Sequence, residues 1–534
     1  MDLEARSVGN VLLLPQDVTG ICTGADGFLY GMARDGICRL MVPESGEIGG
    51  EIMADFLNSS IDGPNAALLA AADGDTFLLR VSEDVGTASW PVLYRRAPDI
   101  DLAQITTLEL AHAFPLDASL RTFIAAYNRS HADCRILVAD YSDRNTDDDP
   151  LAGANALAFA IAAGTDRPDL VIGVPGAEDV GLLIRKSLCA DLMPFLKQDD
   201  FLTPDNVFCA VKTAYAADGI LWGLPLSFTV SSLYSTRDIL GSLADGDGWT
   251  VGELLDFAES LPSDVRLFNG LSRENAADSL LGPSGYRLFL DRKRAKCAFD
   301  SPEFLRWLNF LASLPSYRDA EHIRDNEQLY GLYHTGKIAL AEDHVYDYVN
   351  RFRRAAIWGT DDAVRIGYPS ENGDGAAVTS ESVFLLTRFS ASPEAAWDFI
   401  RFCFRENEER PSYDIPEVPA LKSTFDKAVS RHLGASVAVF FNGSLMTFDP
   451  GPDDPASDDE LDQPGILRAM DEESAERMKE ELDRPGFPIG DALPLAVAEI
   501  IEEEISVFLS GTISAQDCAG RIQSRAAIWL AENK

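Results

Sequence analysis

The chain has 534 residues, of which 46% are hydrophobic and 25% are charged, a composition typical of globular proteins with two or three domains. Asp and Glu outnumber Lys and Arg by 86 to 45, which leaves a net charge of −41. A surface this acidic repels phosphate backbones and anionic lipids, so the composition argues against nucleic-acid binding.

The N-terminal part carries two similar hairpin patterns, at 21–30 and 67–79, each with an Ala-Asp-Gly turn between apolar runs. The two turns lie 47 residues apart, a spacing similar to that of β-propeller blades. Two such units cannot close a propeller, which needs at least about four. Residues 1–103 are therefore predicted to be all-β, as a propeller fragment or a small sheet packed on the rest. A separate binding module is the alternative.

From residue 104 the pattern changes to alternating strands and helices. Apolar runs at 105–110, 135–139 and 169–173 predict strands, and Asp117 precedes a helical stripe of apolar residues. This rhythm is typical of an α/β fold with a mostly parallel sheet.

The middle and the C-terminus are richer in predicted helix. Thr250–Glu253 reads as a capping box, and Ser301-Pro302 as a helix start. Further helices are expected over 395–404 and 497–508, and after Ser514. Between them, the acidic and Pro-rich segment 449–463 predicts a loop.

Motifs for catalysis and metal binding are missing from the sequence. It contains no H-E-x-x-H, G-x-S-x-G, Walker A or G-x-G-x-x-G. His334 and His344 lie ten residues apart, which is not a helical metal-ligand spacing. The acidic runs at 147–149, 245–248 and 453–462 lack the EF-hand pattern. We therefore expect solvated loops there, with no metal and no cofactor.

The cysteines and the first residues of the chain are the features that relate to the cellular compartment. The eight cysteines include no C-x-x-C pair. Cys22 and Cys38 flank a predicted hairpin and could pair, although buried thiols are favoured. No stretch has the roughly 18 apolar residues of a membrane span, and 11–14 is too short for a signal-peptide core. Either the protein stays inside the cell or a leader has been removed.

Seven short segments occur in an order that identifies a family. They are Leu120–Asn128 with 135–138, Pro168–Ile172, 190–196, Gly219–Pro225 (GILWGLP), Trp249–Leu254 (WTVGEL), Gly336–Leu340 (GKIAL) and Ala395–Ile400 (AAWDFI). Each motif alone is weak. Together, over 104–534, they resemble the family 1 extracellular solute-binding proteins, the maltose-type and other sugar-binding lipoproteins of ABC importers.

The resemblance implies the type II periplasmic-binding-protein fold, in which hinge strands join two α/β lobes. Lobe 1 would hold 104–227 and 382–415, and lobe 2 would hold 228–381 and 416–534. The lobes would close around a solute, favoured to be a mono- or oligosaccharide, and deliver it to permease subunits. The resemblance further implies a monomer that catalyses no reaction and works outside the cell. A leader and lipid anchor would have preceded Met1 or been removed.

Carried over by position, the resemblance implies ten ligand-contacting residues in the lobes and the hinge: Phe114, Glu178, Ser227, Phe228, Thr229, Asn269, Ser272, Asp343, His344 and Tyr346. Tyr346 stands where sugar binders of the family often place a stacking Trp. Glu178 and Asp343 could accept hydrogen bonds from ligand hydroxyls or from a cationic group. The segment 174–178 has no aromatic residue and 373–375 has no Trp, which departs from the sugar-binding pattern.

Two other functions stay open at this point. A polysaccharide-active enzyme would need two carboxylates about 5 to 10 Å apart across a cleft, and the sequence singles out no such pair. A sensor subunit would present its ligand to a membrane kinase instead of a permease.

Overall fold

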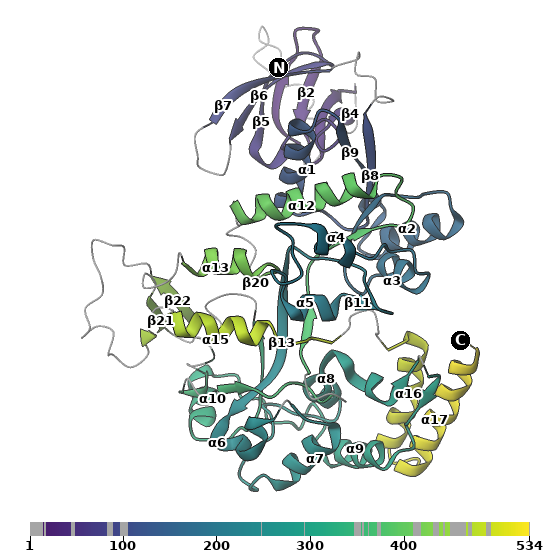
Figure 1. The fold of residues 1–534 in the computed structure, drawn as a ribbon, viewed down its shortest axis with the longest axis vertical. Coiled ribbons are helices and arrows are strands. Elements are labelled where there is room, and N and C mark those ends of the chain that lie inside the picture. The colour runs from purple at the N-terminus through teal and green to yellow at the C-terminus, as the bar shows by residue number, and fades with distance from the viewer. Residues whose placement is uncertain are drawn as a thin grey trace, which may run out of the picture. The chain divides into compact units, whose positions relative to one another are not determined.

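The chain folds into two compact units (Figure 1), known from a computed structural model. The structure describes residues 14, 18–43, 48–82, 89–96, 105–246, 248–292, 294–345, 354, 357–360, 363–370, 375–409, 418–430, 437–441, 444–448, 466–467, 472–487 and 493–532. The first unit holds Met1–Gly173, Ala177–Ala190 and Phe384–Ser412, and the second holds Val174–Gly176, Asp191–Val383 and Tyr413–Lys534. Both units contain helices and sheets, as the predicted α/β class requires.

The sheet of the first unit is built around a parallel centre. Its strands are β8 (Thr106–His112), β9 (Cys134–Asp140), β10 (Leu170–Gly173) and β19 (Val383–Leu386), in the order β19-β10-β8-β9. β8 is parallel to both β9 and β10. Every residue of β10 is buried, as expected for a strand with both faces covered. The predicted β-α-β rhythm is confirmed in this unit.

Helices of the first unit begin and pack as local sequence rules dictate. They are α1 (Ala118–Ser130), α2 (Ala152–Ala163), α3 (Glu178–Arg185) and α12 (Pro393–Glu409), with the short 3-10 turns η1 (Gly63–Asn65) and η3 (Ser142–Arg144). Asp117 caps α1 by accepting a hydrogen bond from the Leu120 N–H at 2.8 Å. α1 packs on α12, where the rings of Tyr127 and Phe399 lie 5.1 Å apart.

The N-terminal strands form two small antiparallel sheets (purple in Figure 1). One holds β1 (Thr19–Thr23), β2 (Leu29–Met32), β3 (Gly36–Met41) and β4 (Gly49–Asp55), and the other holds β5 (Ala66–Asp73), β6 (Thr76–Ser82) and β7 (Ser89–Arg95). Both predicted hairpins, β1-β2 and β5-β6, are confirmed. Tyr30 and Phe77 join the sheets in one core through an edge-to-face ring contact of 5.8 Å.

This β-rich part packs on the sheet of its own unit. Asn58 accepts a hydrogen bond from the Val138 N–H at 2.8 Å and donates one to the Val138 carbonyl at 3.3 Å. Arg135 donates to the Ser60 hydroxyl at 3.2 Å, and Arg129 donates to the Ser60 carbonyl at 3.0 Å. Because β9 is the last strand of its sheet, the Asn58 amide occupies backbone groups that would otherwise form an open edge.

The second unit is organised around one long strand, β13 (Ser227–Thr236). β13 pairs with β16 (Ala341–Val345), β17 (Ala363–Arg365), β18 (Ala377–Thr379) and β20 (Val418–Pro419), and every pairing is antiparallel. The parallel pattern predicted from the strands between 105 and 173 does not extend to this unit. Periodicity predicts strands but not their direction, and the partners come from segments more than 100 residues away from β13.

The remaining elements of the second unit surround this sheet. Its helices are α4 (Met193–Gln198), α5 (Cys209–Ala214), α6 (Arg237–Leu240), η4 (Gly241–Asp245), α7 (Val251–Ser260), α8 (Ala276–Leu281), η5 (Gly282–Phe289), α9 (Pro302–Ser313), α10 (Asn326–His334), α13 (Lys422–Ser430), α15 (Glu472–Leu482), α16 (Leu495–Leu509) and α17 (Ala515–Glu532). Its short strands are β11 (Ala216–Ala217), β12 (Ile220–Leu221), β14 (Leu290–Asp291), β15 (Lys296–Cys297), β21 (Val437–Phe441), β22 (Ser444–Phe448) and β23 (Ile466–Leu467). The capping box at Thr250 is confirmed by both of its reciprocal bonds. The predicted acidic loop 449–463 lies outside the described residues.

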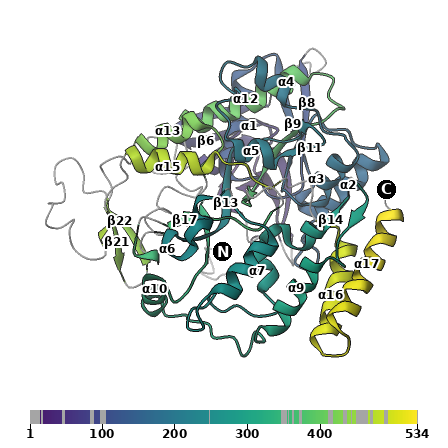
Figure 2. The same ribbon diagram turned by 60° about the horizontal axis from the view of Figure 1, so that its bottom comes forward.

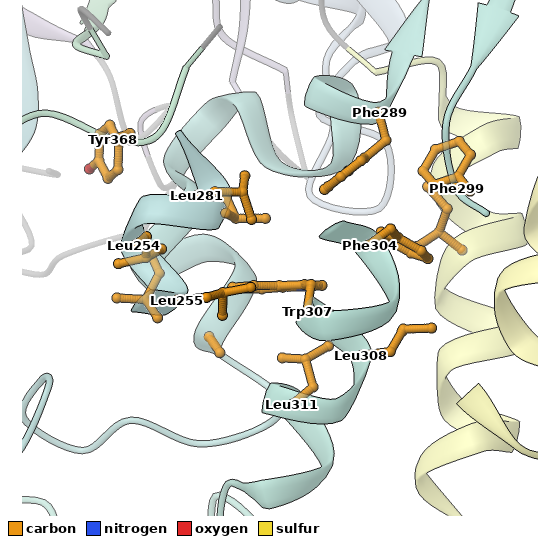
Figure 3. Packing of buried hydrophobic residues seen from close by; sticks show 14 of the residues in the cluster. Leu254, Leu255, Leu281, Phe289, Phe299, Phe304, Trp307, Leu308, Leu311 and Tyr368 are labelled. Atoms are coloured by element: carbon orange, nitrogen blue, oxygen red, sulfur yellow. The ribbon is translucent and has the colours of Figure 1, made fainter. Parts of the chain in front are cut away.

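An aromatic core fixes these helices together (Figure 3). Trp307 and Phe304 of α9 are fully buried, and Phe304 lies 4.9 Å from the ring of Phe289 and 5.2 Å from that of Phe299. α16 and α17 lie side by side in Figures 1 and 2, and α17 packs on α9. Leu233 of β13 belongs to the same hydrophobic core as these helices.

Two expectations on cysteines and membranes can be compared with the structure. All eight cysteines lie in the described part of the chain, and none of them forms a disulfide there. Cys22 and Cys38 are therefore thiols. Within the described ranges, no helix is both long and apolar enough to cross a membrane.

Candidate functional site

One face of the β13–β16 ladder, called the polar face below, carries Ser231, Glu342 and His344 beside the buried Leu233, and the other face is buried. Ser231 stands opposite His344, and Ser232 stands opposite Asp343. Because side chains alternate along a strand, Ser231 and His344 share the solvent-facing side with Thr229, which is half-buried. Ser232 and Asp343 share the buried side. The alternation of side chains therefore places Ser231 and His344 on one face of the ladder, and Ser232 and Asp343 on the other.

Polar contacts link the groups on this face. The Ser231 hydroxyl lies 2.7 Å from His344 Nδ1, and His344 Nε2 lies 3.9 Å from a carboxylate oxygen of Glu342. Glu342 also accepts a hydrogen bond from the Tyr368 hydroxyl. Burial, with Glu342 beside it, raises the pKa of Tyr368 far above its ordinary range, so the phenol stays a donor. The His344 side chain remains 52% exposed and can present its ring to a solute.

The buried face carries a charged cluster centred on Arg354. Its Nε lies 2.9 Å from an Asp343 carboxylate oxygen, and its two Nη atoms lie 3.0 and 3.3 Å from Glu481. The guanidinium also stacks 3.7 Å from the centre of the Tyr234 ring. Burial alone would raise the pKa of Glu481, but Arg354 and Arg365 outweigh burial and lower that pKa. The carboxylate of Asp343 is thus engaged inside the unit.

Three predicted site residues have structural partners in the second unit. The Phe228 ring is fully buried 5.6 Å from Phe208, so it offers no stacking surface in this conformation. The Asn269 amide makes two bonds of 3.1 Å with the backbone of Ile323. Ser272 is buried and exchanges hydrogen bonds with Asn275.

The remaining predicted site residues lie in both units, and one of them is outside the described residues. Ser227 and Thr229 are half-buried on β13, on the same sheet as Asp343 and His344. Glu178 is exposed at the start of α3 and pairs with Arg185. Phe114 is half-buried after β8, and its carbonyl lies 2.9 Å from His112 Nδ1. Tyr346 lies outside the described residues.

Two polar residues, Ser231 and Asp179, were not identified from the sequence. The alternation Ser227, Thr229, Ser231 in the SFTVSSLYST segment was a signal for Ser231 on the same face. Asp179, next to the predicted Glu178, is fully buried. Neither of its carboxylate oxygens has a hydrogen-bond partner among the described residues. Burial raises the pKa of Asp179 to about 6. The only local signal for the buried Asp179 was the position of an acidic residue directly before the apolar run 180–184 (VGLLI).

A second titratable cluster lies in the first unit, on β8. A hydrogen bond with Asp166, followed by burial, raises the pKa of Glu109 to about 7. Asp166 also accepts a hydrogen bond from the Tyr141 hydroxyl at 2.6 Å, and Asp169 accepts one from the Glu109 N–H at 2.9 Å. Across the described ranges, no group of three or more His, Cys, Asp or Glu side chains could hold a metal ion.

The ladder presents hydroxyl, carboxylate and imidazole groups from regular strands of the second unit. Comparison with known families shows to which class the protein belongs. A family model described as bacterial extracellular solute-binding protein matches residues 124–432, more than half of the chain. The chain belongs to this family, which confirms the resemblance found in the sequence.

Other comparisons found distant likeness only. A search of curated proteins found no match. Among solved structures, the sugar-binding protein MalE from Xanthomonas citri is 14% identical, with a TM-score of 0.46 over 80% of this chain and 98% of that one. A family 1 extracellular solute-binding protein from Alicyclobacillus acidocaldarius is 12% identical, with a TM-score of 0.45 over 80% and 98%. One from Bifidobacterium longum subsp. infantis is 16% identical, with a TM-score of 0.42 over 79% and 99%.

Proposed function

We propose that the protein captures an extracellular carbohydrate and delivers it to the permease of an ABC importer. The observation that carries the proposal is membership of the extracellular solute-binding family over residues 124–432. The protein would act as a monomer at the outer face of the membrane, held there by a lipid anchor, and would make or break no bond in its ligand. The transporter's ATPase would supply the energy of import.

The polar face of the β13–β16 ladder supports a carbohydrate as the ligand. Thr229, Ser231, Glu342 and His344 combine hydroxyl, carboxylate and imidazole groups. These groups donate and accept hydrogen bonds in the mixed pattern that sugar hydroxyls present. They stand on regular strands, so their spacing is held by the sheet. Phe114, Glu178, Ser227 and Tyr346 remain proposed contacts by position in the family, whereas Asp343 is buried against Arg354 and is not proposed.

A thermal-shift screen tests the proposal. Mono-, di- and oligosaccharides are added to the purified protein, with peptides and polyamines as competing classes. A ligand that binds only the folded state raises the midpoint of unfolding, and the rise grows with the ratio of ligand concentration to its Kd. For the sugar that shifts the midpoint, Ser231→Ala and His344→Ala should weaken binding. Ser524→Ala removes an exposed hydroxyl on α17 and serves as the matched control that should bind normally.

Two further assays and the neighbouring genes separate the competing functions, and light scattering tests the monomer. Stimulation of the partner transporter's ATPase by the loaded protein supports delivery. Release of shorter sugars from oligosaccharides would instead indicate a polysaccharide-active enzyme, and a histidine kinase encoded beside this gene would favour a sensor. Light scattering should give the mass of one chain.

A further inference from the structure

A cavity of about 630 Å³ lies in the first unit, between the N-terminal β-rich part and the start of α1. The β-rich part lines it from β1, from the turn after β2, and from η1 and β5, while Leu116, Ala118 and Arg121 line the opposite side. The volume is within the range of small-molecule sites, roughly 300–1,000 Å³. The packing of the β-rich part on the rest of its unit therefore creates a space large enough for a ligand.

One wall of this cavity is apolar. Met32, Phe56, Leu68 and Leu116 line it, and their exposed fractions lie between 1% and 8%. Met32, Phe56 and Leu68 belong to the core that joins the two N-terminal sheets, so the wall is held in place by that core. A molecule that covers this wall removes apolar surface from water, which favours binding.

Small residues keep the space open. Glycine and alanine account for much of the rest of the described lining: Gly20, Ala33, Gly63, Ala66, Ala67 and Ala118. At Gly63, a Cβ would lie 2.5 Å from the Phe56 ring, so a larger residue would disturb the apolar wall. Because protein interiors are normally close-packed, an open space of this size beside a buried core indicates a place for a ligand.

Arginine side chains line the cavity next to the apolar wall. Arg121, on the first turn of α1, is 13% exposed, and its Nη2 lies 2.7 Å from Asp35 and 3.5 Å from the Arg34 carbonyl. Both of these contacts use Nη2, and a guanidinium carries further N–H donors on Nη1 and Nε. Arg34 itself is exposed in the turn between β2 and β3. A ligand can therefore accept hydrogen bonds from both arginines while the ion pair with Asp35 stays intact.

The acidic groups nearby have partners of their own. Asp62 accepts a hydrogen bond from the Thr122 hydroxyl at 3.1 Å, and Asp55 accepts one from the Asn58 N–H at 2.7 Å. Burial raises the pKa of Asp55, which reduces its negative charge. Asp35, Asp55 and Asp62 are not among the described lining residues. The polar groups that face the space are thus mainly donors.

The cavity shares no described residue with the polar face of the ladder. The polar face lies in the second unit, whereas every described lining residue of the cavity belongs to the first. An apolar wall also suits a different ligand, because sugar hydroxyls buried against it would lose their hydrogen bonds to water. Binding at the two places can therefore be measured separately.

We propose that this cavity binds a small amphipathic carboxylate, the apolar part of which lies on Met32, Phe56 and Leu116. The carboxylate group lies at Arg34 and Arg121. Arginine presents a planar fork of donors that matches a carboxylate in pairs. The apolar wall supplies the affinity for the rest of the molecule, and the arginines select the charged end.

Isothermal titration calorimetry with octanoate tests the site, and 1-octanol, which has the same chain length and no charge, is the comparison. The site variants are Arg34→Gln, at an exposed turn position, and Ala118→Phe, which places a ring in the cavity. Arg294→Gln removes the same charge from a surface pair of the second unit. Ala527→Phe adds the same ring at an exposed position of α17. These two proteins are the matched controls.

Octanoate should bind the parent protein, and Arg34→Gln should weaken binding by about tenfold, the effect of one charge-assisted hydrogen bond. Ala118→Phe should weaken it at least as much, 1-octanol should bind less tightly than octanoate, and both controls should bind as the parent does. The proposal is overturned if octanoate does not bind, if either site variant binds it as tightly as its control, or if 1-octanol binds equally well. Sugar binding should be unchanged in both site variants, and its loss would contradict the separation of the two sites.

Discussion

Replacement of Arg354 by Met is the sharpest test of how the second unit is held together. The side chain is 10% exposed, and its two carboxylate partners, Asp343 and Glu481, are 10% and 20% exposed. Met fills similar volume but removes the cation that both carboxylates share, which leaves Glu481 beside Arg365. Removing one partner of a buried ion pair costs about 3–5 kcal/mol, and loss of the contact with the Tyr234 ring adds about 1 kcal/mol.

The penalty should depend on pH in a defined direction. In the parent protein the pKa of Glu481 is lowered, so its stabilisation is present above the unfolded pKa and is lost as the pH falls. In Arg354→Met, burial is no longer offset by the Arg354 cation, so the pKa of Glu481 rises above its value in the parent protein. The penalty is then full at about pH 8 and shrinks toward about pH 5.5, as Glu481 becomes protonated.

Urea denaturation of both proteins at the two pH values measures the change in unfolding free energy. Arg294→Met, at a surface pair in which the arginine is 77% exposed, serves as the control and should cost less than about 0.5 kcal/mol. Adding Glu481→Gln to Arg354→Met should recover part of the lost unfolding free energy, because it removes the charge of one carboxylate that Arg354 had paired. A loss below about 1 kcal/mol, or one independent of pH, would refute the assignment of Arg354 as the centre of a buried charge cluster.

Three further perturbations follow from the described contacts. Asn58→Ala should cost about 1–3 kcal/mol in denaturant titration, because the Val138 N–H and carbonyl lose their partner. Glu109→Gln should raise the thermal midpoint relative to the parent more at about pH 8 than at about pH 5.5. The parent loses stability as the pH rises through the raised pKa of about 7, whereas Gln cannot ionise and still donates to Asp166. Thr250→Ala should cost about 1 kcal/mol by removing the capping box of α7.

Matched surface changes give the baselines for these three. Asn309→Ala, Asp291→Asn and Ser524→Ala alter exposed side chains of the same chemistry and should stay within about 0.5 kcal/mol of the parent. An Asn58→Ala protein as stable as Asn309→Ala would mean that the β-rich part does not protect the β9 edge. If Glu109→Gln changed the thermal midpoint by the same amount at both pH values, that would contradict the raised pKa of Glu109 and its hydrogen bond with Asp166.

Elements that depend on near neighbours in the sequence were predictable. The Asp117 cap and the Thr250 capping box are made within three residues, so the pattern alone indicates them. The hairpin at Asp26-Gly27 is equally local, because Gly27 has a φ of +87° that favours glycine. The order of seven family motifs predicted the family, which the match over 124–432 confirms.

Features that depend on distant segments were not predictable. Arg354 and Glu481 are 127 residues apart in the sequence, and nothing local in either segment indicates the other. The burial of Phe228 depends on Phe208 and on its pairing with Val418 of β20, so position in the family motif suggested a ligand contact where the fold has a core residue. Residues 191–227 belong to the second compact unit, and their assignment to the first lobe of the family fold stays a prediction.

Titration of the purified protein with carbohydrates by calorimetry tests the central claim most directly. We expect at least one saccharide to bind with a single site per chain, and Ser231→Ala and His344→Ala to weaken that binding while Ser524→Ala does not. Absence of binding across the saccharide panel, together with binding of a peptide or a polyamine, would contradict carbohydrate capture.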